Sequence, residues 1–310
     1  MLLSQKRLCQ LLGLLWYIDG VLQLQPQMFT TTMVNQVMVS TWPGQPALIE
    51  ISLRWIMMVM MRHLIVMNLL IAAVQLGIGF CLYSGRWVKK ALLVSVAWSL
   101  LVWYGGEGMS MVLTGQASAL TGAPGAVLLY PLLGLVLYLR SPGEAGRAPR
   151  LQVRWLLAGF WLLAALLQMQ PFWWQDGAFS DLMGSMVGLG GLNAVLLDPT
   201  FQWLSTVTAQ GEIVLNSVLV LVFLGLGLSL ALLRPERLRP ALVASIVVSV
   251  VIWWFAQGFG MIFTGLATDF NSGPLLIIMA LACWYKAPLL PVAPEQAAFA
   301  VEMRETSQSV

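Results

Sequence analysis

Charged residues are scarce in this sequence. Only 9% of the residues are Asp, Glu, Lys or Arg, whereas 59% are hydrophobic and the mean hydropathy is +0.83. A soluble domain carries about 25% charged residues. So few charges cannot cover a water-exposed surface of this size, and lipid is the expected solvent for most of the chain. The net charge of +3 is spread over short loops and does not predict nucleic-acid binding.

Histidine and cysteine are also rare, which narrows the cofactors. His63 is the only histidine, so this chain alone cannot hold a bis-histidine haem, or a zinc or di-iron centre built from several histidines. The methionines around His63 leave copper(I) ligation as one alternative and flexible apolar packing as the other. Cys9, Cys81 and Cys283 have no motif spacing and predict neither disulfides nor a metal site.

Motifs for catalysis are absent as well. The sequence has no Ser/His/Asp arrangement, no paired carboxylate motif, no Gly-Lys-Ser/Thr phosphate loop and no dinucleotide fingerprint. We therefore expect no catalysis by the side chains of this chain alone.

An internal repeat is present instead. Trp16 to Gln23-Leu-Gln-Pro26 recurs as Trp161 to Gln168-Met-Gln-Pro171, and Trp103 to Thr114-Gly115 recurs as Trp253 to Thr264-Gly265. A repeat of this kind determines the architecture before any single helix is considered. Positions that are charged in only one half become candidates for a specialised site.

Eight apolar stretches are long enough, or nearly so, to span a bilayer as helices. We expect an all-α integral membrane protein with eight transmembrane helices as two parallel four-helix repeats. Two further segments, 32–60 and 178–210, are too polar or too broken to span, and we expect amphipathic or re-entrant segments on the extracytoplasmic side. The expected spans are 8–28, 63–84, 90–113, 124–140, 153–173, 212–233, 240–263 and 273–288.

Charge bias orients the chain in the membrane. All 16 basic residues except Arg54 and Arg62 fall on one side of the expected spans, which the positive-inside rule makes the cytoplasmic side, with both termini. The expected domains are a first repeat (1–140), a cytoplasmic linker (141–152), a second repeat (153–288) and a disordered cytoplasmic tail (289–310).

Ionisable residues at membrane depth are costly and are candidates for function. The first half has a polar intramembrane cluster, and its counterpart positions are uncharged: Ala164, Gln257, Gln210 and Gly211. Acids and bases therefore change together between the halves, which is typical of ion pairs that hold helices together; the other interpretation is a polar pocket or proton-linked site. The cluster comprises Asp19, Arg54, Arg62, His63 and Glu107.

Two further groups of residues stand out. We expect Glu212, Gln257, Asn68 and Asn216 near the repeat interface, where an amide can hydrogen-bond across helices. Glycines and threonines recur at the end of the third helix of each half, and such broken backbone lines a cavity or is buried in protein. These helix-end residues are Gly106, Gly108, Thr114, Gly115, Gly258, Gly260, Thr264 and Gly265.

Each half resembles the four-helix unit of the DoxX/DoxD-like membrane protein family, so the chain looks like a tandem duplication of that unit. The resemblance rests on Arg7-Leu-Cys-Gln-Leu-Leu-Gly13 with Asp19-Gly20, and on Asn68 to Gly79 followed by Gly85-Arg-Trp-Val-Lys-Lys-Ala91. Glu212 stands where such units often have an acidic residue, whereas Gly106-Glu-Gly108 is not a motif of the family. The resemblance implies a bacterial-type inner-membrane protein that associates with redox enzymes, often in quinone-linked electron transfer.

Three hypotheses follow for function. The first is a redox-associated, quinone-linked subunit or anchor with a redox partner, which predicts a lateral opening and a pocket that touches Glu107 or Asp19. The second is a small-molecule or proton-coupled transporter, which predicts a polar path through the membrane. The third is a structural subunit of a larger membrane assembly. Membrane lipid surrounds the protein in all three.

Overall fold

The computed structural model describes residues 3–139 and 150–284, and these residues form helices and loops without any strand. The expected linker and tail fall largely or wholly outside these residues. The main helices are α1 (Gln5–Leu22), α3 (Ala47–Arg62), α4 (Leu64–Ser84), α5 (Val88–Gly105), α6 (Ala126–Tyr138), α7 (Arg150–Gln168), α8 (Ala178–Ser185), α10 (Asp198–Thr208), α11 (Glu212–Leu232), α12 (Leu238–Phe255) and α13 (Ser272–Ala282).

Five helices of the described chain are long and apolar enough to cross a membrane, so this is a multi-pass membrane protein by length and composition. They overlap five of the expected spans and are α4, α5, α7, α11 and α12. The other three expected spans are shorter or more polar. Helix α1 contains Lys6, Arg7 and Asp19, and α6 and α13 have 13 and 11 residues.

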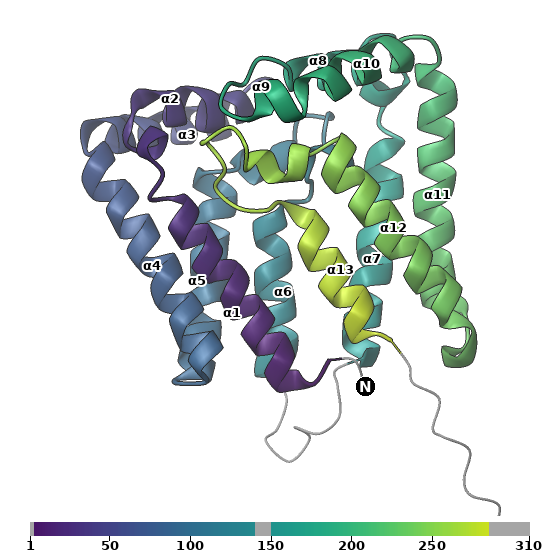
Figure 1. Cartoon of the computed structure of the whole chain (residues 1–310), viewed down its shortest axis with the longest axis horizontal. Coiled ribbons are helices and arrows are strands. Elements are labelled where there is room, and N and C mark those ends of the chain that lie inside the picture. Colours follow the sequence, from purple (N-terminus) through teal and green to yellow (C-terminus); the bar gives the residue numbers. More distant parts are fainter. Residues whose placement is uncertain (1–2, 140–149, 285–310) are drawn as a thin grey trace, which may run out of the picture.

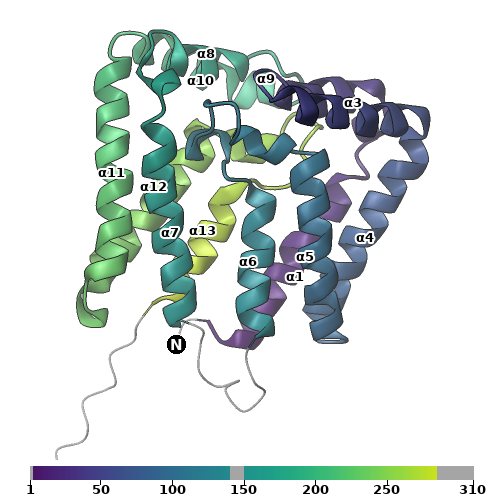
Figure 2. The same ribbon diagram turned by 180° about the vertical axis from the view of Figure 1, so that it is seen from behind.

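Short helices lie across one end of the long ones (Figures 1 and 2). On the first-half side these are α2 (Thr31–Met33), the π-helical turn Val34–Met38 and α3, and on the second-half side α8, α9 (Asn193–Leu196) and α10. They correspond to the two segments, 32–60 and 178–210, that the sequence shows as too broken to span. We call this end of the molecule the α3 end.

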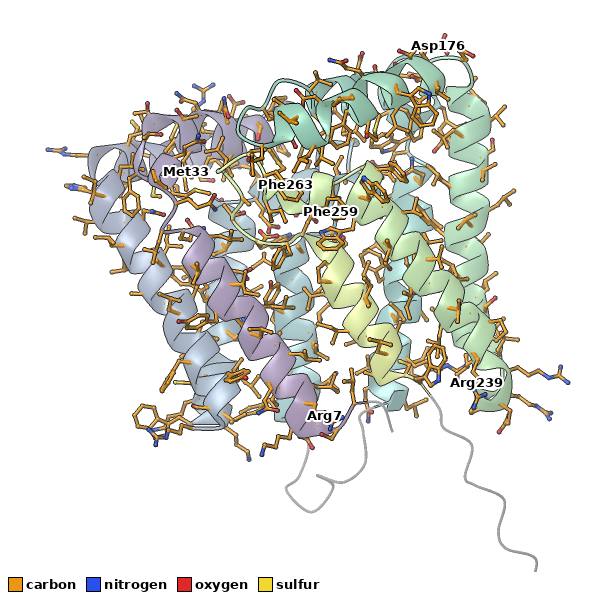
Figure 3. All side chains as sticks on the ribbon, in the orientation of Figure 1. Arg7, Met33, Asp176, Arg239, Phe259 and Phe263 are labelled. Atoms are coloured by element: carbon orange, nitrogen blue, oxygen red, sulfur yellow. The ribbon has the colours of Figure 1, made fainter. Side chains whose placement is uncertain are left out.

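Charge separates the two ends of the molecule. Arg7 and Arg239 lie at the end opposite α3, and Asp176 lies at the α3 end (Figure 3). The turns α4–α5 and α11–α12 also lie opposite the α3 end (Figure 1), and five of the ten other described basic residues lie in or next to them: Arg86, Lys89, Lys90, Arg234 and Arg237. The expected charge asymmetry is thus present in the fold.

Equivalent helices pack in the same way in both halves. Helix α1 packs on α4 as α7 packs on α11, and α5 packs on α6 as α12 packs on α13. Small residues allow the first contact: a Cβ on Gly79 would lie 2.6 Å from the backbone nitrogen of Tyr17. The equivalent Gly227 lies against Leu162, where a Cβ would come within 2.7 Å of its side chain.

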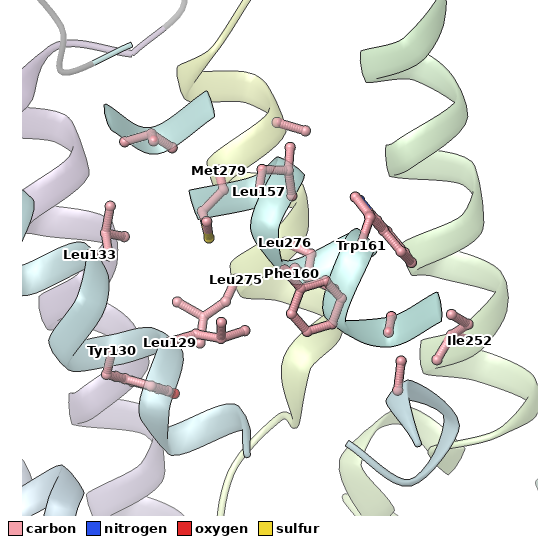
Figure 4. Close-up of a cluster of buried hydrophobic side chains, with 14 of the residues drawn as sticks. Leu129, Tyr130, Leu133, Leu157, Phe160, Trp161, Ile252, Leu275, Leu276 and Met279 are labelled. Atoms are coloured by element: carbon pink, nitrogen blue, oxygen red, sulfur yellow. The ribbon is translucent and has the colours of Figure 1, made fainter. Parts of the chain in front are cut away.

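A shared core joins the halves at the centre of the molecule (Figure 4). Helix α6 of the first half and α13 of the second contribute Leu133 and Met279, and α7 contributes Leu157. All three side chains are at most 1% exposed. The two halves therefore form one packed body, and the site described next lies within the first half, under the α3 end.

Candidate functional site

A cavity of about 210 Å³ lies within the first half. Helices α1, α4, α5 and α6 form its walls, and each contributes a polar or aromatic side chain: Asp19, Gln75, Trp98 and Tyr130, respectively. The turns at the α3 end and the loop that carries Asp269 cover it. The cavity has the features of a ligand site: most of its lining is apolar, and a few polar side chains point into the same space.

Three carboxyl groups from distant parts of the chain line this cavity. Asp19 is on α1, Glu107 follows the end of α5, and Asp269 belongs to the loop before α13 of the second half. The hydroxyl of Tyr130 hydrogen-bonds to Asp19. Ser110 donates to Glu107 at 2.9 Å. No basic side chain lines the cavity, so the site disfavours an anionic head group.

Glu107 and Asp269 lie in loops outside the spanning helices, and burial changes their acidity. Burial raises the pKa of Glu107, and the neighbouring charge of Asp269 raises it further. Burial likewise raises the pKa of Asp269, partly offset by hydrogen bonds from the Asn271 backbone and the Thr268 hydroxyl. Like charges this close disfavour double ionisation, so the two carboxyls hold a proton more readily than exposed ones.

Four buried polar atoms at the cavity have no hydrogen-bond partner. They are Asp19 Oδ1, Gln23 Oε1, Gln75 Oε1 and Trp98 Nε1. Asp19, Gln23 and Gln75 are at most 4% exposed. Buried polar groups are almost always paired, and leaving one unpaired costs about 1–3 kcal/mol. A polar head group bound in the cavity would satisfy several of these atoms at once.

A second, more polar cavity of about 270 Å³ adjoins the first at the α3 end. Glu107, Asp269, Gly106, Val37 and Thr268 line both cavities. The rest of its lining is rich in hydroxyl and amide groups, which come from Ser40, Thr41, Ser110, Thr121 and Asn271. The carboxyls of Glu107 and Asp269 therefore lie between a mainly apolar space and a polar one.

A third space is an apolar groove of about 310 Å³ between α3 and α4. Ile56 and Met60 line both this groove and the first cavity. Its other walls are Trp55, Val59 and Met67. Trp55 is 64% exposed and Val59 is 49% exposed, so the groove opens sideways, toward the surface that lipid would cover. We call it the lateral groove.

The side of the cavity away from the α3 end is closed by packed side chains. Trp16 donates from Nε1 to Ser95 at 3.0 Å, and its ring lies 4.6 Å from that of Tyr130. Beyond these residues Leu12, Leu92 and Leu133 are at most 1% exposed. No polar path continues from the cavity in this direction within the described residues.

The second half fills the equivalent space with apolar side chains. Phe223 on α11 corresponds to Gln75 on α4, and it is fully buried with its ring 5.4 Å from that of Trp161. Ala164 corresponds to Asp19. Gln257 corresponds to Glu107 and donates to Ala119 O and Ser272 Oγ, both at 2.9 Å. The specialised lining thus comes from the helices of the first half, together with the loop of the second half that carries Asp269.

The structure brings together two of the five residues of the expected polar cluster. Asp19 and Glu107 line the cavity, whereas Arg54, Arg62 and His63 are exposed at the α3 end. Arg54 pairs with Glu50 one turn away and lies over the Trp42 ring. The ion-pair explanation is therefore wrong for Asp19 and Glu107, since no basic side chain bridges to either of them among the described residues.

The residues expected at the repeat interface are also separated. Only Gln257 reaches the other half, through Ala119. Asn68 donates to Gln23 O at 2.7 Å and Asn216 donates to Gln168 O at 3.3 Å, so each amide joins helices of its own half. Glu212 accepts hydrogen bonds from Ser180 N and Oγ rather than from an arginine. The prediction of a position at the repeat interface was wrong for Asn68, Asn216 and Glu212, because the capacity of a side chain to hydrogen-bond does not reveal which helix provides its partner.

The glycine-rich helix ends form sharp turns in both halves. Helix α5 ends at Gly105, earlier than expected, because the chain then enters the left-handed region at Gly108 and stays there through Met111. A Cβ on Gly108 would lie 2.7 Å from Thr41 Oγ1. The second half repeats the turn at Gly258–Met261. In the first half this turn holds Glu107 at the boundary of the two cavities.

Sequence reasoning missed Gln23, Gln75, Trp98, Tyr130 and Asp269. A comparison of the two halves gave a detectable signal for two of them, and one is Gln75, whose matched position in the second half is Phe223. Comparison of amides between the halves, and not only of charges, would have found it. Asp269 is likewise charged in only one half, since its matched position is Ala119, but the sequence does not show that its loop reaches the cavity of the first half.

Comparison with known proteins finds no matching protein-family model, curated protein or solved structure. Among the described residues, no group of three or more His, Cys, Asp or Glu side chains is placed to hold a metal ion.

Proposed function

We propose that this chain has eight membrane spans, arranged as two parallel four-helix repeats, with both termini in the cytoplasm of a bacterial-type cell. Matched hydrogen bonds support the repeat: Trp161 donates to Ser245 at 2.9 Å as Trp16 donates to Ser95. Trp103 and Trp253 each donate to a backbone carbonyl near the start of the following helix. The basic end opposite α3 supports the orientation.

We infer that the protein binds a membrane-soluble quinone and acts as a quinone-linked subunit or anchor of a redox assembly in the inner membrane. One observation carries this inference: the cavity with its unpartnered polar atoms shares Ile56 and Met60 with the lateral groove. A quinone has a polar ring and a hydrocarbon tail. The ring would occupy the cavity, and the tail would lie in the lateral groove. The quinone would supply the redox chemistry, and the chain supplies binding and orientation.

The experiment is native mass spectrometry, with lipid and quinone extraction, of protein purified in mild detergent from its own membranes. We expect about one quinone for each wild-type chain, or a redox subunit that co-purifies. The variant Gln75→Phe copies the second half and should lose the quinone. Gln168→Leu removes a buried amide from the second half and should retain it. A wild-type chain that carries only bulk phospholipid would overturn the proposal.

Transport of a small molecule is the second candidate function. The polar cavity at the α3 end and the three carboxyls favour it, because they would admit a neutral or cationic solute from that side. The packed residues beneath Trp16 oppose it, since transport needs access from both sides. Uptake of a solute by reconstituted vesicles, in the absence of bound quinone, would favour this candidate and leave a purely structural role untenable.

A further inference from the structure

Glu107 and Asp269 occupy the boundary between two unlike spaces. Each lines both the first cavity, which is mainly apolar, and the polar cavity at the α3 end. They come from different halves of the chain, on the turn after α5 and on the loop before α13. A carboxyl in this position can contact a bound head group on one side and water on the other.

The polar cavity connects these carboxyls with the outside of the molecule. Ser110 donates to Glu107, and the hydroxyl of Thr41 lies close to the same turn at Gly108. Ser40 and Thr121 line the polar cavity and are exposed at the surface. Hydroxyl groups and the water between them can pass a proton along such a path.

The opposite direction offers no such path within the described residues. The indole of Trp16 is occupied by Ser95, and Leu12, Leu92 and Leu133 follow beneath it. A proton would have to cross several layers of packed hydrocarbon to reach the end opposite α3, at a large desolvation cost. The cavity is therefore open to protons from one end only.

Few titratable groups share the site with this pair. Asp19 on α1 and Tyr130 on α6 face the first cavity, and no histidine, lysine, arginine or cysteine lines either cavity. The loop that follows α5 and the loop that precedes α13 contribute only Glu107 and Asp269 themselves. Protonation of the site therefore depends on carboxyls, and the phenol hydrogen-bonds to one of them.

We propose that Glu107 and Asp269 exchange protons between the head group of the bound ligand and the aqueous phase at the α3 end, and not with the opposite phase. This inference rests on the proposed quinone site, because it assigns the head group to the first cavity. The pair thereby gives the site a fixed sidedness: any proton that the ligand gains or loses comes from, or goes to, the α3 side.

A consequence for binding follows from the chemistry of the head group. The oxygens of an oxidised quinone only accept hydrogen bonds, and a carboxyl donates one only while it is protonated. Raising the pH at the α3 end should therefore weaken quinone binding, whereas raising the pH at the other end should leave it unchanged. The two carboxyls act here as proton-exchanging residues, and no electron transfer is required for the test.

The test uses full-length protein in vesicles of uniform orientation and a short-tailed ubiquinone analogue as the probe. Binding is followed by quenching of tryptophan fluorescence, since Trp16 and Trp98 line the cavity. We expect the dissociation constant to rise about tenfold when the pH at the α3 end is raised through the range in which the carboxyls titrate. A tenfold change in affinity corresponds to a difference of about one unit in carboxyl pKa between the free and the bound protein. The same pH change on the other side should have no effect.

Variants separate this role from a purely structural one. The double variant Glu107→Gln/Asp269→Asn should lose most of the response to pH at the α3 end, whatever its affinity for the analogue at a single pH. Glu212→Gln removes a buried carboxyl that lines neither cavity and should keep the full response. A response to pH at the opposite end, or an unchanged response in the double variant, would overturn the proton route. Failure of the wild-type protein to bind the analogue at any pH would instead overturn the quinone site.

Discussion

Trp16 and Ser95 form a 3.0 Å hydrogen bond that closes the cavity on the side away from α3. The indole nitrogen donates across from α1 to α5, so two helices of the first half are fixed at this level. The second half contains the same bond between Trp161 and Ser245, at 2.9 Å. The bond therefore belongs to the architecture of each half, while only the first half has the carboxyl-lined cavity above it.

The paired tryptophans allow stability and binding to be separated. Trp16→Phe and Trp161→Phe each remove one buried hydrogen bond, and each should lower the free energy of unfolding by about 1 kcal/mol. Only Trp16→Phe should weaken quinone binding, because Trp161 packs on Phe223 and faces no carboxyl. Thermal unfolding in detergent and quinone titration provide the two measurements. Equal loss of binding in both variants would count against the position of the site.

Gln75→Phe should stabilise the protein while it abolishes binding. The change replaces a 4% exposed amide, whose Oε1 has no partner, with the residue found at the matched position of α11. Removal of an unpaired buried polar atom and filling of apolar space should together raise the free energy of unfolding by about 1 kcal/mol. A Gln75→Leu variant controls for ring size. Retention of quinone by Gln75→Phe would exclude this cavity as the binding site.

The sequence predicted the helices better than their contacts. The expected span 63–84 matches α4, Leu64–Ser84, and 212–233 matches α11, Glu212–Leu232, because both are long apolar runs with a charged or polar boundary. The expected span 90–113 ran past Gly105, since Met109 and Met111 look like further helix. Their backbone is left-handed, in a turn where Gly108 approaches Thr41 closely, and no local pattern reveals this long-range contact.

The candidate site was predictable only in part for a similar reason. Asp19 and Glu107 were identifiable because a charge within an expected span is costly and their counterparts are uncharged. Their shared cavity and the third carboxyl, Asp269, depend on how a loop of the second half crosses to the first. Arg54 and Arg62 were grouped with the acids by charge alone, yet α3 lies across the end of the bundle and leaves both exposed.

Arg154 should stabilise the second half by capping a neighbouring helix. Its guanidinium donates to the carbonyls of Leu230, Ala231 and Leu233 at the end of α11, at 2.5–3.0 Å. A positively charged donor near the C-terminus of a helix hydrogen-bonds to the last carbonyls and interacts favourably with the negative end of the helix dipole. Arg154→Leu should therefore cost about 2 kcal/mol in thermal unfolding. Arg234→Leu, an exposed residue on the same turn, is the control and should change little.

The orientation of the chain can be tested by thiol labelling. After replacement of Cys9, Cys81 and Cys283, single cysteines at Arg237, in the turn α11–α12, and at Asp181, on α8, place a thiol at opposite ends of the molecule, because these two elements lie at opposite ends (Figure 1). A membrane-impermeant maleimide added to intact cells should label Asp181→Cys, and should label Arg237→Cys only after the cells are opened. The reverse pattern would put the basic end outside and contradict the positive-inside assignment.

The pH dependence of stability should report on Glu107 without any ligand. Burial, and then the charge of Asp269, raise the pKa of Glu107 in the folded protein. From about pH 4, the ordinary carboxyl range, the unfolded chain releases its proton while the folded protein keeps it. Because the folded state then binds more protons, stability falls as pH rises until the folded pKa is passed. Glu107→Gln removes this loss, so the unfolding temperature of the variant should rise further above that of the wild type as the pH goes from acid to neutral.

Gln257→Glu is the matched variant, because it places a carboxyl at the equivalent, 2% exposed position of the second half. Its unfolding temperature should fall further below that of the wild type over the same pH range. A constant difference between Glu107→Gln and wild type across pH would mean that Glu107 is an ordinary, solvated carboxyl.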